Sequence, residues 1–194
     1  MIIVDTEGTG TEPHLHSVLS IGALDFDNPA NTFYEECRMW DGAKVEDEAL
    51  AVCGFTREGI VDPKKQSEAV MIKKFIKWAA TCKEHTLAGQ SVSFDRDFLK
   101  YAAIRAHENW PFAHRTVDLH AVCYFDMIKK GIAIPTKNSH SGLNLDKVLE
   151  YVGIPKRSGT HNAFDDAKLE AESFSRLFYH KPLLEEYKKF PVQR

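Results

Sequence analysis

Two acidic residues interrupt the first apolar run of the chain, which begins MIIVDTEGTG. Ile2, Ile3 and Val4 predict a short, buried strand. Asp5 and Glu7 follow one residue apart, so on an extended backbone both carboxylates point to the same face. Two such groups repel each other and lose hydration unless a cation neutralises them. The stretch is therefore either a polar strand end or half of a site for a divalent cation.

The overall composition limits the classes of protein that this chain can belong to. Its 194 residues favour one domain and are enough to bury a core. The hydrophobic content of 43% and the charged content of 27% are ordinary for a globular protein. The net charge of -3 argues against a protein that wraps long duplex DNA, but it leaves room for a small site that binds a few phosphates.

The cysteines and the apolar runs indicate where such a chain works. The four cysteines are widely spaced, and we expect reduced, mostly buried thiols rather than disulfides or a zinc site: Cys37, Cys53, Cys82 and Cys123. No apolar run approaches the length of a membrane span, and no basic segment precedes an apolar one near the N-terminus. We therefore expect a cytoplasmic protein with no membrane association.

The pattern of apolar residues predicts three strands first and alternating helices and strands afterwards. A hairpin start followed by strand–helix units implies an α/β fold, with a mixed sheet between helices. Strands are expected over 2–5, 17–27, 31–40 and 86–92, with a strand end near 116. Helices are expected over 47–54, 66–82, 93–108, within 116–131, over 145–154 and over 161–179, with a loop at 132–144.

Further acidic residues lie at the ends of two later elements. Asp95 lies in SVSFDRDFL at a strand-to-helix junction, and Asp166 lies in GTHNAFDDA, five residues after His161. Each has a simpler interpretation, because Asp95 can cap its helix, Asp166 can complement a helix dipole, and a lone histidine is usually part of a loop. The order of all the acids together favours a metal site, and hard oxygen ligands favour Mg²⁺ or Mn²⁺ over zinc.

Together these segments resemble the DEDDh (DnaQ-like) family of 3′-to-5′ exonucleases, which includes the proofreading epsilon subunit of bacterial replicative polymerases, RNase T and oligoribonuclease. VDTEGTG resembles the first motif, with Asp5 and Glu7, and QSVSFDRDFL resembles the second, with Asp95. HNAFDDA resembles the third, with His161 and Asp166. EALAVCGFT and LNLDKVLEYVGI also resemble family segments, so the resemblance extends from residue 2 to about residue 179.

The resemblance implies an RNase H-like fold, in which a mixed five-stranded sheet begins with three antiparallel strands, continues with parallel strands and is flanked by helices. It assigns residues 1–180 to the exonuclease domain and 181–194 to a C-terminal extension, of which we expect 185–194 to be a solvated end. It further implies hydrolysis by two divalent ions about 4 Å apart, Mg²⁺ or Mn²⁺. Nucleoside 5′-monophosphates would then leave stepwise from the single-stranded 3′ end of DNA or RNA.

The same resemblance gives each site residue a role. Asp5 would bridge both ions, Glu7 and Asp166 would complete the shell of the water-activating ion, and Asp95 would hold the second ion. His161 would accept the proton of the attacking water near neutral pH. For substrate contacts we expect Gly8 and Thr9 at the terminal sugar and Phe94 against a base, while Phe98 follows the core face of its helix.

Departures from the family pattern leave substrate preference open. Gly8 stands where Thr is usual, Gln90-Ser91 replaces His-Asn, and Cys53 occupies a position that is often His. Asp165 is a rival to Asp166, although a histidine base favours the longer spacing of Asp166. Three alternatives remain: an oligoribonuclease-like enzyme for very short RNA, a non-catalytic nucleic-acid-binding module, and a phosphomonoesterase. A homodimer or a polymerase partner is also compatible with the resemblance.

Overall fold

The computed structural model describes residues 1–193, and its centre is a five-stranded sheet in the order β3-β2-β1-β4-β5. The three N-terminal strands pair antiparallel, whereas β4 and β5 run parallel to β1. This is the mixed sheet that the resemblance predicted. The strands are β1 (Ile2–Gly8), β2 (Val18–Asp25), β3 (Asn28–Glu36), β4 (Leu87–Gly89) and β5 (Thr116–Asp118).

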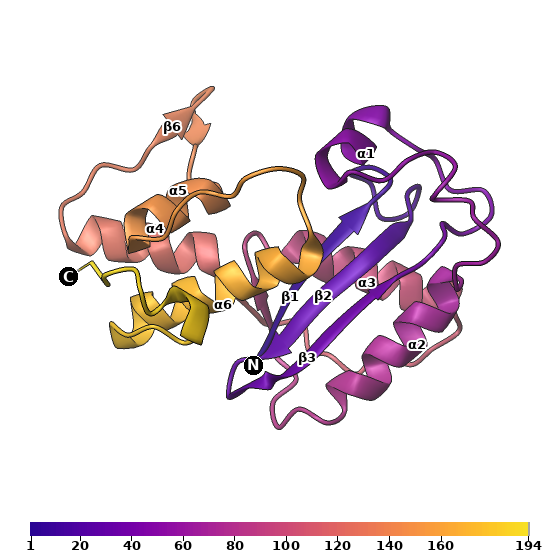
Figure 1. The fold of residues 1–194 in the computed structure, drawn as a ribbon, viewed down its shortest axis with the longest axis horizontal. Coiled ribbons are helices and arrows are strands. Elements are labelled where there is room, and N and C mark those ends of the chain that lie inside the picture. The colour runs from indigo at the N-terminus through magenta and orange to yellow at the C-terminus, as the bar shows by residue number, and fades with distance from the viewer. Residues whose placement is uncertain (194) are drawn as a thin grey trace.

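Residues 1–193 form six helices, of which α2 to α6 cover the two faces of the sheet and α1 lies near one end of the strands (Figure 1). One apolar core lies between the sheet and α2 and α3, and a second lies between the sheet and α4, α5 and α6. None of the helices within residues 1–193 is long and apolar enough to cross a membrane. All four cysteines are buried and unpaired, as predicted. The helices are α1 (Asp47–Cys53), α2 (Glu68–Ala79), α3 (Ser93–Arg105), α4 (Leu119–Lys129), α5 (Leu145–Val152) and α6 (Ala163–Tyr179).

The first strand is longer than predicted. It does not end at Asp5 but stays paired with β2 through Gly8, where the register shifts. Asp5 lies opposite Gly22 and Glu7 lies opposite Ser20. The two acids therefore lie inside a paired strand. The apolar run ends at Val4, and the prediction followed that run, whereas the backbone hydrogen bonds to β2 continue beyond it. Conversely, β4 has three residues, fewer than the predicted 86–92.

The segment predicted as a loop at 132–144 contains a small hairpin, formed by β6 (Thr136–Lys137) and β7 (His140–Ser141). Its turn residues Asn138 and Ser139 have positive φ angles of 51° and 63°. That left-handed backbone at both central positions is typical of a type I′ turn, which suits the twist of a hairpin. Two-residue strands are too short to show an alternating pattern, so composition alone indicated a loop.

The N-terminus of α6 rests directly on β2 at Gly22. A Cβ atom at this position would lie 2.2 Å from the carbonyl carbon of Ala163 and from the nitrogen of Phe164. Only glycine allows this approach, because any side chain would overlap helix backbone. The helix starts there because Asn162 Oδ1 accepts hydrogen bonds from Phe164 N at 3.0 Å and Asp165 N at 3.2 Å. The contact brings the first turn of α6 against the acidic face of β1.

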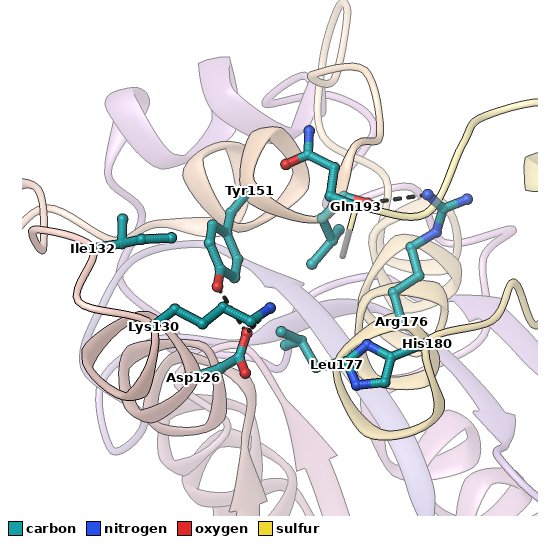
Figure 2. Close-up of a pocket in the computed structure, with 9 residues that line it drawn as sticks. Asp126, Lys130, Ile132, Tyr151, Arg176, Leu177, His180 and Gln193 are labelled. Carbon is teal, nitrogen blue, oxygen red and sulfur yellow. Dashed lines mark hydrogen bonds and ion pairs between the residues drawn. The ribbon is translucent and has the colours of Figure 1, made fainter.

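The C-terminal segment packs on α6, so the expectation of a solvated end is wrong for Tyr187, Phe190 and Pro191, whose carbonyls bind Arg176. A fully buried ion pair, Glu172–Arg176, holds it with an N–O distance of 2.7 Å. Figure 2 shows Arg176 beside a small cavity in which Asp126 bonds to Lys130 and Tyr151. The boundary at residue 180 stays a prediction. The Glu172 carboxylate accepts hydrogen bonds from the backbone nitrogens of Leu183 and Leu184. The Arg176 guanidinium donates hydrogen bonds to the backbone carbonyls of Val152, Tyr187, Phe190 and Pro191.

Replacing Gly22 by Ala should separate α6 from β2. We expect the free energy of unfolding to fall by about 1–3 kcal/mol, the usual effect of forcing an extra methyl group into a packed interior. Chemical denaturation measures this loss. Ser20→Ala, two residues earlier on the same strand face, adds no atoms and serves as the control. Unchanged stability of Gly22→Ala would contradict the close contact described above.

Candidate active site

All five residues predicted for the site line a single pocket of about 360 Å³ at the carboxyl end of β1. Asp5 and Glu7 come from β1, and Asp95 comes from the first turn of α3. Asp166 comes from the first turn of α6, and His161 precedes that helix. Residues separated by up to 161 positions in the sequence therefore meet at one place, which answers the question raised by the acids of β1.

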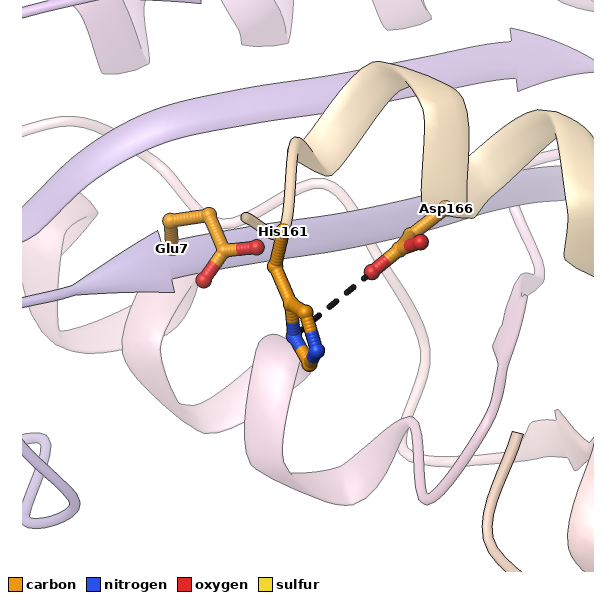
Figure 3. A group of neighbouring side chains, drawn as sticks. All are labelled: Glu7, His161 and Asp166. Atoms are coloured by element: carbon orange, nitrogen blue, oxygen red, sulfur yellow. Dashed lines mark ion pairs between the residues drawn. The ribbon is translucent and has the colours of Figure 1, made fainter. Parts of the chain in front are cut away.

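Glu7, His161 and Asp166 form the tightest group in the pocket (Figure 3). One potential ligand atom from each lies within 4.8 Å of the others, and His161 Nδ1 lies 3.9 Å from Asp166 Oδ2. The backbone nitrogen of His161 donates to the carbonyl oxygen of Val52 at 2.9 Å. This bond anchors the histidine to α1, so its ring keeps its place although it precedes the helix.

Asp95 is held by β1 rather than by its own helix. Thr6 donates to Asp95 Oδ1 from its backbone nitrogen at 2.9 Å and from its hydroxyl at 2.8 Å. The N-cap of α3 is Val92, so the capping role considered for Asp95 is not adopted. Because both bonds use Oδ1, Oδ2 is not needed to fix the side chain. Thr6, the residue between the two acids of β1, therefore locks the third acid beside them.

Burial and mutual repulsion raise the pKa values of these acids. Burial, with the charges of Asp166 and Asp95, raises the pKa of Glu7 to about 8. Burial also raises the pKa of Asp95 to about 7, although the hydrogen bonds from Thr6 oppose the rise. The pKa of Asp5 is raised well above its usual value, mainly by burial and then by the charge of Asp95. The pocket therefore favours protons or cations over free carboxylates.

Glu170 is a fifth carboxylate of the pocket, and it was not predicted from the sequence. It lies one helical turn after Asp166 and is only 1% exposed. Its Oε1 accepts a hydrogen bond from Gln90 N at 3.0 Å, whereas Oε2 has no hydrogen-bond partner among residues 1–193. Gly89 leaves room for that oxygen, because a Cβ there would lie 3.0 Å from it. The four-residue spacing from Asp166 was a readable sign, since such residues share a helix face.

Arg157 is the second residue that the sequence analysis missed. Its Nη1 lies 2.6 Å from Asp166 Oδ2 and 3.3 Å from His161 Nδ1, and its Nε donates to Asp146 Oδ1 at 2.9 Å. Burial raises the pKa of Asp166, and the Arg157 guanidinium opposes that rise. Nothing in the loop sequence PKRSGTH marks this arginine, because its position depends on how the loop folds over the first turn of α6.

The residues predicted to touch substrate divide into two groups. Phe94 is 42% exposed and lines the pocket, whereas Phe98 behind it is buried, as expected. Gly8 is half-buried at the end of β1. The side chain of Thr9 is fully buried, and its hydroxyl donates to the Lys44 carbonyl at 2.7 Å and accepts from Ser17 N at 2.9 Å. This side chain stabilises a loop, and the contact of Gly8 and Thr9 with a terminal sugar stays a prediction.

The rivalry between the two aspartates of the third motif is decided by the helix. Asp165 is exposed and pairs with Lys168 at 2.9 Å, outside the pocket, whereas Asp166 is 3% exposed and lines it. The donor set fits a hard divalent cation, because it consists of carboxylate oxygens, one histidine and the unpartnered oxygen of Glu170. The roles of individual residues in catalysis stay predictions.

Comparison with solved structures finds the same fold in nucleases. Escherichia coli exonuclease I bound to a dA16 oligonucleotide is 18% identical over 92% of this chain and 41% of its own, with a TM-score of 0.72. Cell-death related nuclease 4 is 19% identical over 98% of this chain and 65% of its own, also with a TM-score of 0.72. A zinc-bound complex of E. coli exonuclease I with single-stranded DNA has a TM-score of 0.71, at 18% identity over 93% of this chain and 41% of that one.

This chain spans about two fifths of the length of exonuclease I, so these likenesses show a shared fold. No curated protein sequence matches the chain significantly. The family model described as RNase_T, exonuclease, matches residues 2–174, which is nearly the whole chain. Because that match covers all three acidic motifs, this chain belongs to the RNase_T exonuclease family, as the resemblance to the DEDDh 3′-to-5′ exonucleases predicted.

Proposed function

We propose that this protein is a metal-dependent exonuclease that removes nucleoside 5′-monophosphates from the 3′ end of single-stranded DNA or RNA. The observation that carries the proposal is the convergence of four predicted acids and one histidine in a single pocket of an exonuclease-family chain. Relatives of the same fold were solved with single-stranded oligonucleotides, which supports a single-stranded substrate. The exposed ring of Phe94 offers a face on which a base can stack.

The cations are Mg²⁺ or Mn²⁺ in this proposal, held by Asp5, Glu7, Asp95 and Asp166. When bound, two such ions supply charge neutralisation at the phosphate and at the leaving oxygen, together with an acidified water. Thr6 keeps Asp95 in place, so the acid does not have to be ordered when the substrate arrives. The five carboxylates of the pocket repel one another, and this supports a requirement for positive charge.

His161 accepts the proton of the attacking water in this mechanism. Its ring is about one-third exposed and lies at the pocket wall beside Glu7 and Asp166, where it can reach both protein and solvent. Arg157 places a guanidinium on the same wall, and its remaining N–H groups suit a phosphate oxygen.

This function is tested by comparing the wild-type protein with two separate variants, Asp5→Asn and Asp165→Asn. A 5′-labelled single strand of DNA or RNA, incubated with Mn²⁺ or Mg²⁺, should give a ladder of products shortened from the 3′ end. We expect Asp5→Asn to lose nearly all turnover, because Asp5 is a proposed metal ligand. The variant should stay folded, because the change removes one of several carboxylates that repel one another in the pocket. Asp165→Asn makes the same chemical change outside the pocket and should keep wild-type turnover.

A wild-type protein that binds the strand but yields no shortened products would support a non-catalytic binding module instead. Release of phosphate from simple monoesters, without nucleotide products, would support a phosphomonoesterase. Turnover restricted to RNA of a few nucleotides would identify the oligoribonuclease-like alternative.

The stability of the metal-free protein should depend on pH in a defined direction. Glu7 and Asp95, with pKa values of about 8 and about 7, hold protons in the folded state at a pH at which the unfolded chain has released them. Unfolding then releases protons, so stability falls as pH rises from about 5 to 8. In a chelating buffer we expect the melting temperature to drop across this interval, and Mn²⁺ to restore it.

Glu7→Gln is the matched control for this pH series. It removes the group with the pKa of about 8 and keeps the side-chain shape, so the slope should flatten across the whole interval from about pH 5 to 8. A melting temperature that stays constant or increases over this interval in the wild type would contradict the raised pKa values.

A further inference from the structure

The hairpin of β6 and β7 has no role in the hydrophobic core. All four strand residues are exposed, and the ribbon projects beyond α5 in Figure 1. A two-stranded ribbon is marginally stable on its own, so something else must hold it. Here the positive φ angles of Asn138 and Ser139 form a tight turn, and Gly142 N donates to the Pro135 carbonyl at 2.7 Å. The protein therefore maintains an ordered, solvent-exposed arm.

The arm is connected to the active-site pocket. Ser141 Oγ lies 2.9 Å from His120 Nε2 on α4, which fixes one face of the ribbon. Two residues further along, the Leu143 carbonyl accepts a hydrogen bond from Gln90 Nε2 at 3.0 Å. Gln90 lines the pocket, as do Asn144 and Leu145 immediately after the arm. The base of the arm is thus part of the pocket wall.

The arm carries positive charge in a chain that is acidic overall. No Asp or Glu occurs between Met127 and Leu145. Lys129 and Lys130 in this stretch lie at the end of α4, where Lys130 pairs with Asp126, so the charge of the arm itself comes from Lys137. Lys137 lies opposite His140 in the ladder, and directly opposed residues point to the same face of a ribbon. Lys137 forms no ion pair within residues 1–193, and its side chain is exposed. A polyanion can therefore reach both groups at the same face.

The spacing places this face beyond the cleavage site. Leu143 follows His140 by three positions, which span at most about 10 Å. A phosphate at Lys137 and His140 would belong to a nucleotide further along the strand than the one being removed. Tyr124, 36% exposed and packed against His120 with ring centroids 5.8 Å apart, adds an aromatic surface beside the same arm.

We propose that the 136–141 hairpin is a second contact surface for the single-stranded substrate, with Lys137 and His140 binding backbone phosphates on the 5′ side of the cleaved bond. This proposal rests on the proposed function, because it concerns the same strand whose 3′ end enters the pocket. The contact is electrostatic and independent of sequence, and it serves DNA and RNA alike. It gives an acidic protein a local grip on a strand longer than the pocket itself.

Binding measurements test the contact without requiring turnover. Fluorescence anisotropy of a labelled 12-nucleotide strand is measured with Asp5→Asn protein, with and without the added changes Lys137→Ala and His140→Ala. We expect the two added changes to weaken binding about tenfold at low salt. The slope of log affinity against log salt should become shallower by about 0.7 for each lost phosphate contact on a single strand. Lys77→Ala, an exposed lysine on α2, is the control and should change neither quantity.

Kinetics with substrates of two lengths complete the test. In the otherwise wild-type protein, Lys137→Ala with His140→Ala should raise KM for the 12-nucleotide strand about tenfold and leave kcat unchanged. KM for a dinucleotide, which cannot reach the arm, should stay the same. Equal effects on both lengths, or unchanged affinity and salt slope, would overturn the proposal. If the wild type binds the strand but does not cleave it, the anisotropy still decides on the arm, while the proposed exonuclease function fails separately.

Discussion

The close contact between α6 and β2 at Gly22 determines the rest of the site. The backbone of Ala163 and Phe164 lies where a side chain of β2 would otherwise stand. Asp5 is the cross-strand neighbour of Gly22, so the first turn of α6 comes to rest beside the acidic face of β1. His161 and Asp166 therefore reach the pocket without long or flexible side chains. A helix displaced by the thickness of one methyl group would separate the two halves of the site.

That contact concentrates charge that the metal-free protein has to tolerate. Asp5, Glu7, Asp95, Asp166 and Glu170 share one partly buried volume, and burial is the main cause of each raised pKa. The fold offsets the repulsion in part, with Thr6 bonded to Asp95 and Arg157 bonded to Asp166. The unpartnered Oε2 of Glu170 shows that the compensation is incomplete. The repulsion lowers the stability of the metal-free protein and at the same time favours the binding of cations.

Charge is distributed unevenly over the molecule, and this matters for a nucleic-acid substrate. The chain is acidic overall, and the pocket adds to the negative field that an incoming phosphate meets. Among residues 1–193, Arg157 is the positively charged side chain that lines the pocket, and Lys137 lies on the exposed hairpin beside it. In the proposed function, these two points would hold the end of a strand, whereas an acidic surface is unsuited to coating long nucleic acid.

The sequence by itself determined the family, the order of the five sheet strands and the helices, and four of the five acids that meet at the site. Spacing between residues near each other carries this information: Asp5 and Glu7 share a strand face, and His161 precedes Asp166 by little more than one helical turn. Only the tertiary structure brought Glu170 and Arg157 into the pocket. The spacing of Glu170 from Asp166 puts both on one helix face, but its bond to Gln90 and the bond of Arg157 to Asp166 depend on how separate segments pack, which no local pattern encodes.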